Sequence, residues 1–192
     1  MTGSHPGRGA RGCVNPPGES TVMFREAAAA AAVVRAQTQS NAAKYADLGR
    51  ELRARRPRAV ITCGRGSSEH AATFARYLIE TRIGVLTAAA TPSVHSVYKT
   101  ALNLEQCMFL VISQSGQSPD LLAAAQAARN SGAIVVALIN AADSPVAQAA
   151  HYTLPLLAGP EVCVAATKSF LASLSARWIS ARKVSPMISS RG

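Results

Sequence analysis

Five short runs of apolar residues, each separated from the next by a stretch of helical character, constrain the fold of this chain most. The runs are RAVITC, IGVLTA, CMFLVIS, AIVVALIN and YTLPLL, at residues 58–63, 83–88, 107–113, 133–140 and 152–157. They are continuous rather than alternating, so each predicted strand is buried on both faces, which is typical of a parallel sheet covered by helices. Right-handed crossovers between such strands predict an α/β fold: a doubly wound, five-stranded parallel sheet of the flavodoxin-like type, flanked by helices.

Helices are predicted before and between these runs. Residues 24–56 favour a helix with a break near Ser40–Asn41, and Pro57 ends it. Further helices are expected at residues 67–82, 93–100, 118–132, 144–150 and 162–180. Pro155 indicates that the last strand lies at an edge of the sheet.

The chain divides into four parts on this interpretation. Residues 1–22 are polar and rich in Gly and Pro, which predicts a disordered leader. An N-terminal helical segment follows at 23–57, and the domain with the sheet spans 58–176. Residues 177–192 form a basic tail without a recognisable pattern, which we expect to be a truncated continuation of the chain.

Composition and charge limit the expected partners and location. The longest apolar run outside the strands falls short of the roughly 18 residues that a membrane span requires, and the first residues lack the apolar core of a signal peptide. A cytoplasmic protein without a membrane partner is therefore expected. The net charge of +10 is carried mostly by single arginines scattered among alanines, without interleaved aromatic residues, so nucleic acid is not the expected partner.

The cysteines do not indicate a metal or a disulfide. They stand at positions 13, 63, 107 and 163, with no C-x-x-C pair and no histidine at ligand spacing. Two of them, Cys63 and Cys107, fall within apolar runs, where small buried residues belong. We therefore expect no bound metal and no cofactor.

The loop SQSGQSPD, residues 113–120, carries the strongest functional signal. It follows the predicted central strand and opens a helix, whose unpaired N–H groups and partial positive charge favour phosphate. Ser118 followed by Pro119 is a good start for that helix, while Ser113, Gln114 and Ser115 add neutral donors. A solvated, capped turn is the alternative, but it explains only Ser118–Pro119, so phosphate binding is favoured.

A second loop, CGRGSSEH at residues 63–70, repeats this pattern after the first strand. It contains G-x-G, but Glu69 stands where a dinucleotide-binding loop needs its third glycine, and there is no G-K-[ST] sequence. Two serine-bearing turns on neighbouring strands therefore predict one shared phosphate pocket. Arg65, inside the glycine loop, is a further candidate for contact with the phosphate.

These loops resemble those of the sugar isomerase (SIS) domain family. SQSGQSPD resembles the S-Q-S-G-E-T-x-D loop of the family, GSSEHAA its G-T-S-x-x-A loop, and EVCVAATKSF, residues 161–170, its E-x-x-V-A-S-T-K-x-F segment. The similarity spans about residues 58–175. Within the family the chain resembles the first SIS repeat of the isomerising unit of glucosamine-6-phosphate synthase and of SIS-type glucosamine-6-phosphate deaminases, and the two loops look more like the deaminase branch.

The resemblance implies a set of ligands for a sugar phosphate. The phosphate ligands would be Ser68, Ser113, Gln114, Ser115 and Ser118. The residues along the sugar would be Gly66, Ser67, Val164 and Ala166. Ala166 stands where the family pattern has a serine, so one hydrogen bond to the sugar would be lost.

The implied function is that of a phosphosugar-binding domain of an aminosugar-phosphate isomerase, deaminase or aminotransferase, acting on glucosamine 6-phosphate or fructose 6-phosphate. The relatives contain two SIS repeats, and their catalytic glutamate, ring-opening histidine and imine-forming lysine lie in the second repeat or behind it. We therefore expect that the site lacks its second repeat and has little activity alone. A phosphosugar-sensing regulatory module without catalysis is the alternative, and a non-functional fragment is a third possibility.

Three residues near the loops are weaker catalytic candidates. Glu161 is either a base toward a sugar proton or an anion placed at the start of the last helix. Lys168 is either an imine-forming amine or a lysine at an interface, and His70 either a catalyst or a surface histidine. Self-association into a homo-oligomer is also expected, and its contact would be the last helix. The residues of that contact would be Phe170, Leu171, Leu174 and Trp178.

Overall fold

The computed structural model describes residues 21–98, 100–162 and 166–176, and within them the predicted sheet is confirmed. The sheet has five parallel strands in the order β2-β1-β3-β4-β5. The strands are β1 (Ala59–Cys63), β2 (Leu86–Ala89), β3 (Cys107–Ser113), β4 (Ile134–Ile139) and β5 (Tyr152–Pro155). Pro155 ends the edge strand β5, as its missing N–H predicts.

The helices largely follow the predicted positions. They are α1 (Val22–Ser40), α2 (Ala42–Arg55), α3 (Ser67–Ile83), α4 (Pro92–Ser96), α5 (Pro119–Asn130), α6 (Pro145–Ala149) and α7 (Lys168–Leu174). The break expected near residue 40 falls at Asn41, whose Nδ2 donates to the carbonyl of Pro155 at 2.8 Å. This bond fixes the junction of α1 and α2 beside the edge strand β5.

The first helix begins slightly earlier than the predicted end of the leader. The leader was predicted to reach residue 22, but Thr21 caps α1 and Val22 begins it, because the Thr21 hydroxyl accepts the N–H of Phe24. Residues 1–20 of the predicted leader and the predicted basic tail at 177–192 lie outside the described residues.

The predicted start of the last helix at residue 162 is wrong, because α7 begins only at Lys168. Two contacts explain the late start. The N–H of Val162 donates to the carboxylate of Glu26 on α1, at 2.9 Å, instead of entering a helix. The carboxylate of Glu161 accepts the N–H of Lys168 at 2.6 Å and so occupies the beginning of α7.

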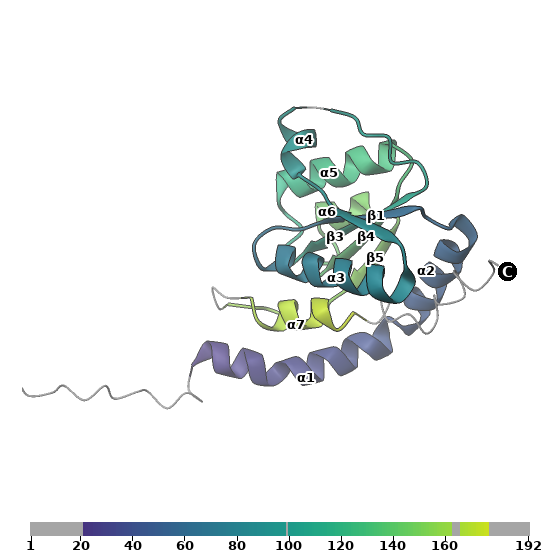
Figure 1. Cartoon of the computed structure of the whole chain (residues 1–192). Coiled ribbons are helices and arrows are strands. Elements are labelled where there is room, and N and C mark those ends of the chain that lie inside the picture. The colour runs from purple at the N-terminus through teal and green to yellow at the C-terminus, as the bar shows by residue number, and fades with distance from the viewer. Residues whose placement is uncertain (1–20, 99, 163–165, 177–192) are drawn as a thin grey trace, which may run out of the picture.

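The side chains of each central strand divide the core into two layers. On β3, Met108, Leu110 and Ile112 belong to the layer with α2, α3 and α7, whereas Phe109 and Val111 belong to the layer with α5 and α6. Figure 1 shows the same division, with α4, α5 and α6 above the sheet and α3 and α7 below it. Both faces are therefore covered, as continuous apolar strands require.

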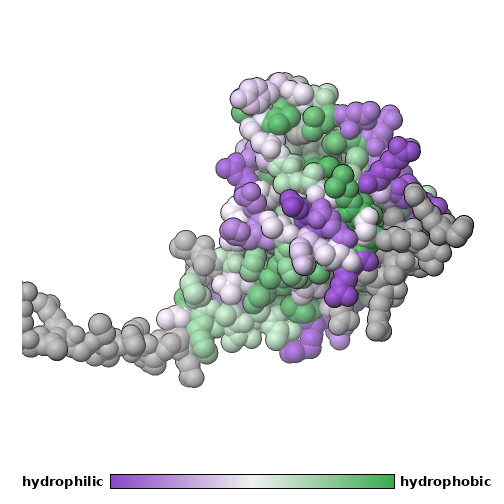
Figure 2. Space-filling model, in the orientation of Figure 1, coloured by the Kyte–Doolittle hydropathy of each residue, from purple (hydrophilic) through white to green (hydrophobic). Residues whose placement is uncertain are grey.

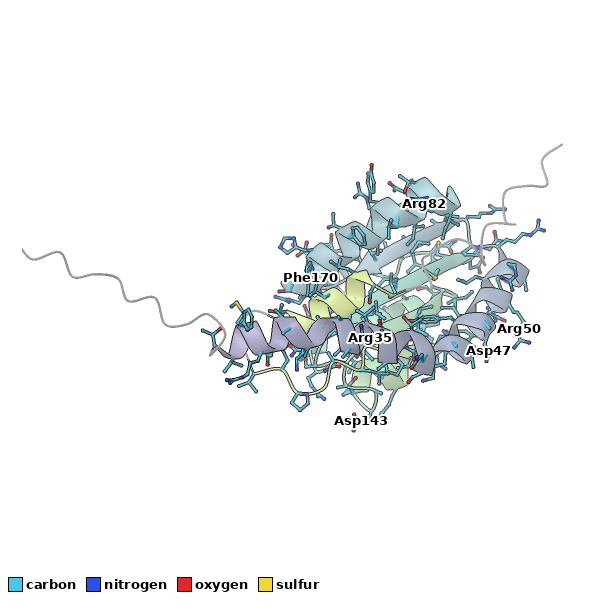
Figure 3. All side chains as sticks on the ribbon, turned by 90° about the horizontal axis from the view of Figure 1, so that it is seen from below. Arg35, Asp47, Arg50, Arg82, Asp143 and Phe170 are labelled. Carbon is cyan, nitrogen blue, oxygen red and sulfur yellow. The ribbon has the colours of Figure 1, made fainter. Side chains whose placement is uncertain are left out.

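The long helix α1 forms an additional layer below α7 (Figure 1). Its buried residues are Glu26, Ala30 and Gln37, and the amide oxygen of Gln37 accepts the Ser175 hydroxyl at 3.1 Å. Viewed from below, α1 crosses the molecule beside the helix that carries Phe170 (Figure 3). Figure 2 shows apolar surface over this part of the molecule. The N-terminal helix is thus attached to α7 by polar as well as apolar contacts.

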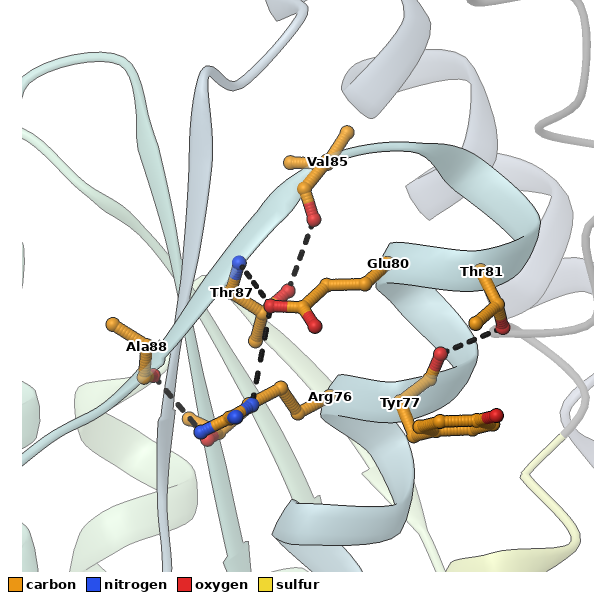
Figure 4. Close-up of polar contacts among 8 residues, drawn as sticks. Arg76, Tyr77, Glu80, Thr81, Val85, Thr87 and Ala88 are labelled. Atoms are coloured by element: carbon orange, nitrogen blue, oxygen red, sulfur yellow. Dashed lines mark hydrogen bonds and ion pairs between the residues drawn. The ribbon is translucent and has the colours of Figure 1, made fainter.

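The edge strand β2 is protected from pairing with another strand. The carboxylate of Glu80 accepts the N–H of Thr87 at 3.1 Å, and the Thr87 hydroxyl donates to the carbonyl of Val85 at 3.2 Å (Figure 4). Arg76 lies 3.9 Å from the same carboxylate. These contacts occupy backbone groups that an incoming strand would need, which is a common protection of exposed edges.

Candidate functional site

The strand order places a switch point between β1 and β3. From β1 the chain crosses to β2 on one side, whereas β3 and the later strands lie on the other side. In doubly wound sheets, ligands bind at such a point, outside the carboxyl ends of the strands. Cys63 of β1 lies opposite Val111 of β3, so the loops that follow the two strands leave the same edge of the sheet. Both loops predicted to bind phosphate are therefore at the switch point.

The serine loop, residues 113–118, is folded on its own hydroxyls. The buried Ser113 accepts the N–H of Gly116 at 3.1 Å, and the exposed Ser115 accepts the N–H of Gln117 at 3.3 Å. A hydroxyl that accepts a backbone N–H keeps its own proton for another acceptor. Ser118 is the N-cap residue of α5, but its side chain does not make the capping bond that the Ser-Pro sequence predicts.

Residues that follow β4, up to the first turn of α6, support this loop. Gly116 has a left-handed φ of 63°, and a Cβ at this position would lie 2.1 Å from the Ser144 hydroxyl oxygen. The N–H of Val146 donates to the carbonyl of Gly116, and the N–H of Ala141 to that of Gln114. Gly116 therefore leaves room for the side chain of Ser144, the N-cap residue of α6.

The glycine loop, residues 64–66, packs tightly at one position only. A Cβ on Gly64 would lie 2.7 Å from the carbonyl oxygen of Ser68, so this glycine lets the first turn of α3 approach β1. Gly66 precedes α3 with a φ of 55° and has open space around it. Ser67 is exposed and Ser68 half-buried, both in the first turn of α3.

An ion pair between Arg65 and Asp120 joins the two loops. Asp120 lies in the first turn of α5, where the helix dipole favours a negative charge. Burial, and then the charge of Asp120, raise the pKa of the Cys63 thiol to about 12, so this thiol at the end of β1 stays neutral. Asp120 was missed by sequence reasoning, although an acid directly after Ser-Pro in a loop with ligand-binding character could have drawn attention to it.

Glu161 connects the serine loop to α7. One carboxylate oxygen accepts the N–H groups of Lys168 and Ser169, at 2.6 and 3.4 Å. The other accepts the Ser169 hydroxyl and the side-chain N–H of Gln114, the latter at 3.3 Å. Of the two roles considered for Glu161, this geometry fits an anion that caps a helix rather than a base that is open to a substrate.

The remaining predicted site residues differ in their contacts and in their exposure. The ammonium of Lys168 donates to the carbonyl of Pro160 at 2.7 Å and so holds the loop before α7. Ala166 is half-buried two residues before α7, whereas His70 is exposed on α3. Val164 lies outside the described residues.

The described part of the chain offers this site neutral donors and one nearby guanidinium. Over residues 21–98, 100–162 and 166–176, no three His, Cys, Asp or Glu side chains are grouped so that they could hold a metal ion. Among the helices that the structure describes, none is both long and apolar enough to cross a membrane. Hydroxyls, an amide and helix N-termini at a switch point can bind a small anionic ligand.

The fold and the two loops at its switch point define an α/β domain of the doubly wound class. The family model of the SIS domain matches residues 52–183. The chain therefore belongs to the SIS domain family, and the resemblance carried by its three sequence motifs is confirmed.

Known relatives include isomerising aminotransferases. The chain is 40% identical over 120 residues to the isomerising glutamine–fructose-6-phosphate aminotransferase of Symbiobacterium thermophilum; this covers 62% of the chain and 19% of that enzyme. A solved protein of Silicibacter pomeroyi, provisionally named a phosphosugar isomerase, is 38% identical with a TM-score of 0.78, over 84% of this chain and 51% of that one.

A protein solved with a bound sugar phosphate shares the fold at lower sequence identity. The NanR protein of Vibrio vulnificus, solved in complex with ManNAc-6P, has a TM-score of 0.69 and 17% identity, over 90% of this chain and 64% of that one. This likeness shows the fold alone. The chain spans about a fifth of the length of the Symbiobacterium enzyme and about half the length of the Silicibacter protein.

Proposed function

We propose that this SIS domain binds a sugar phosphate, with the phosphate at the serine loop. The observation that carries the proposal is the arrangement of Ser113 and Ser115, which accept backbone N–H groups and keep their own protons at the start of α5. Neutral donors at a helix N-terminus bind phosphate without holding it too tightly for exchange. The relatives' names support a sugar phosphate as the ligand class.

The proposed ligands divide into two groups. The phosphate would contact Ser68, Ser113, Gln114, Ser115 and Ser118. The sugar would contact Gly66, Ser67, Val164 and Ala166. The proximity of the two loops at the switch point supports the first group, because the ion pair of Arg65 and Asp120 requires the loops to be neighbours.

We propose aminosugar-phosphate chemistry as the setting of this binding. It would be isomerisation, deamination or amino transfer between glucosamine 6-phosphate and fructose 6-phosphate, because the curated relative is an aminotransferase that isomerises its sugar. In the described residues, the side chains of Glu161 and Lys168 are engaged in contacts that hold α7 and its preceding loop. His70 is the remaining weak candidate for proton transfer. The proposal therefore concerns binding, and assigns no catalytic base.

A phosphosugar-sensing role is the second candidate. The Vibrio vulnificus NanR protein shares the fold and was solved with a sugar phosphate. A sensor needs the binding loops but not a catalytic base, which agrees with the engaged side chains of Glu161 and Lys168. Release of ammonia from glucosamine 6-phosphate by the purified protein would favour the enzyme, and binding without turnover would favour the sensor.

We also propose that the domain self-associates in the cytoplasm through the apolar surface around α1 and α7 (Figure 2). Val22, Met23 and Phe24 are 42–47% exposed at the start of α1, and Leu171 is 37% exposed on α7. Phe170 and Leu174 instead pack partly against the core, and Trp178 lies outside the described residues. Exposed apolar residues grouped in this way commonly mark a protein contact. Sedimentation at tens of micromolar tests this proposal, and a clean monomer contradicts it.

Calorimetric titration is the experiment that tests the proposed binding. Fructose 6-phosphate and glucosamine 6-phosphate are titrated into the protein, with fructose and glucosamine as matched ligands without the phosphate. We expect saturable binding of the phosphorylated sugars and much weaker binding of their parents. Equal affinity for a sugar with and without its phosphate would contradict the proposal.

A further inference from the structure

Arg65 is a cation at the switch point that the proposed ligand set does not use. It follows β1 directly after Gly64, and its guanidinium contacts the carboxylate of Asp120 in the first turn of α5. Asp120 is only two residues beyond Ser118, the N-cap residue of α5. The guanidinium therefore lies beside the start of the same helix that would receive the phosphate.

Asp120 occupies a place where an anionic ligand would also be favoured. The N-terminal turn of α5 attracts negative charge, whether it comes from a side chain or from a ligand. The side chain of Arg65 is 65% exposed and that of Asp120 20% exposed. Because the Arg65 side chain is mostly exposed, the pair contributes only weakly to stability.

A guanidinium has donors to spare for a second anion. Its five N–H groups match the oxygens of a phosphate, and the contact with Asp120 uses one nitrogen. The other cation next to the site, Lys168, donates to the carbonyl of Pro160 at 2.7 Å and holds the loop before α7. Arg65 is thus the cation better placed to respond to a ligand.

We propose that Arg65 is a further phosphate ligand of this site and that Asp120 competes with the phosphate for its guanidinium. This inference rests on the proposed function. Without ligand, Asp120 neutralises Arg65 and holds it between the two loops. When a phosphorylated sugar binds, the guanidinium turns to the dianionic phosphate, whose higher charge gives stronger hydrogen bonds than a carboxylate. The pair would then favour phosphate over ligands with a single negative charge.

A purely structural role is the competing explanation. If the ion pair only held the two loops together, neutralising either partner would loosen the site and weaken binding in the same direction. Competition predicts opposite directions: loss of Arg65 weakens phosphate binding, whereas loss of the Asp120 charge strengthens it. The two explanations therefore differ in the sign of one measurable effect.

The test is calorimetric titration of fructose 6-phosphate into the wild-type chain, Arg65→Gln, Asp120→Asn and the double variant, at low and high salt. Arg82→Gln is the control, because it removes the same charge at the far end of α3 from the site (Figure 3). We expect Arg65→Gln to weaken binding about tenfold and to reduce its salt dependence. Asp120→Asn should strengthen binding severalfold, and Arg82→Gln should leave it within about twofold.

The outcomes separate this inference from the proposed function. Wild-type binding together with an unchanged affinity of Arg65→Gln would overturn the role of Arg65 and leave the serine loop in place. Weaker binding by Asp120→Asn would overturn the competition and establish a structural pair. If the wild-type chain does not bind fructose 6-phosphate, the proposed function and this inference fail together. Thermal unfolding of every variant, expected near the wild-type midpoint, ensures that the affinities compare folded proteins.

Discussion

The two loops at the switch point are built differently, although both follow a central strand and begin a helix. The serine loop contains the buried Ser113, receives N–H groups from the segment after β4, and is linked to α7 through Glu161. In the glycine loop Arg65 and Gly66 are exposed, and Gly66 has open space around it. The serine loop is held from several directions, whereas the described contacts of the glycine loop run to the first turn of α3 and to Asp120. We therefore expect the serine loop to be the more rigid of the two.

The largest expected effect comes from adding a methyl group to Gly116 of the serine loop. In Gly116→Ala the new Cβ would meet the Ser144 hydroxyl oxygen at 2.1 Å and Ile139 at 2.4 Å, at a φ that alanine disfavours. We expect a loss of about 3 kcal/mol or more in the free energy of unfolding, from overpacking and backbone strain together. Urea unfolding followed by circular dichroism measures this loss.

Gly66→Ala is the matched control, because its φ of 55° is similar but nothing lies within 4 Å of the new Cβ. With a ψ of −127° this residue lies in a region that side chains rarely adopt, so backbone strain alone should cost about 1–3 kcal/mol there. Equal losses in the two variants would contradict the claim that the serine loop is the tightly supported one.

The next effect concerns the contact between the serine loop and α7. Glu161→Ala removes the acceptor of the Lys168 N–H and of the Gln114 amide, so both α7 and the loop lose a partner. We expect a loss of about 1–2 kcal/mol in unfolding free energy, which is the usual range for a helix cap. Glu161→Gln is the control, because it keeps an acceptor oxygen and should recover part of the loss. If Glu161→Ala unfolds at the wild-type urea concentration, Glu161 does not support α7 as described.

The smallest effect is a pH dependence at the opposite end of the sheet. His151 lies just before β5, and its Nδ1 accepts the N–H of Val135 at 3.0 Å. Burial, with smaller contributions from Arg129 and Arg55, lowers the pKa of His151 below its ordinary value of 6.5. The unfolded chain therefore binds this proton more readily, so the contribution to stability is complete above pH 6.5 and decreases as the pH falls below that value.

His151→Asn tests this assignment, because the asparagine side-chain oxygen can accept the same bond without titrating. We expect the wild-type chain to lose slightly more unfolding free energy than the variant between pH 7 and pH 5, because only His151 takes up a proton there on unfolding. If the unfolding free energies of the wild-type chain and the variant depend on pH in the same way, His151 does not carry the pH dependence.

The sheet could be predicted from the sequence because its signal is local. Each strand is one apolar run, and the pattern on β3 already separates the two layers of the core. The two ligand loops could be predicted for the same reason, since each is a short stretch between a strand and a helix. What was missed depends on residues far apart in the chain. Ser144 meets Gly116 across 28 positions, and Asp120 meets Arg65 across 55.

The start of α7 shows the same limit most clearly. The composition from residue 162 onward favours a longer helix. In the structure, Glu26 accepts the N–H of Val162, before the helix, and Glu161 accepts the N–H of Lys168, its first residue. Local propensity is a weak prior that such contacts routinely override. Glu161 was already a candidate for the start of the last helix, but no local feature indicates the contact with Glu26, 136 positions away.

The binding of fructose 6-phosphate to Ser115→Ala/Ser118→Ala is the most direct measurement of the central claim. Both hydroxyls lie at the start of α5, and neither is buried, so their removal should leave the fold intact. Ser131→Ala, at the other end of the same helix, is the matched control. We expect calorimetry to show that the double variant loses about 2 kcal/mol or more of binding free energy, at about 1–3 kcal/mol for each phosphate oxygen left without its hydrogen bond. The control should lose none. An unchanged dissociation constant in a folded double variant would contradict the assignment of the serine loop as the phosphate site.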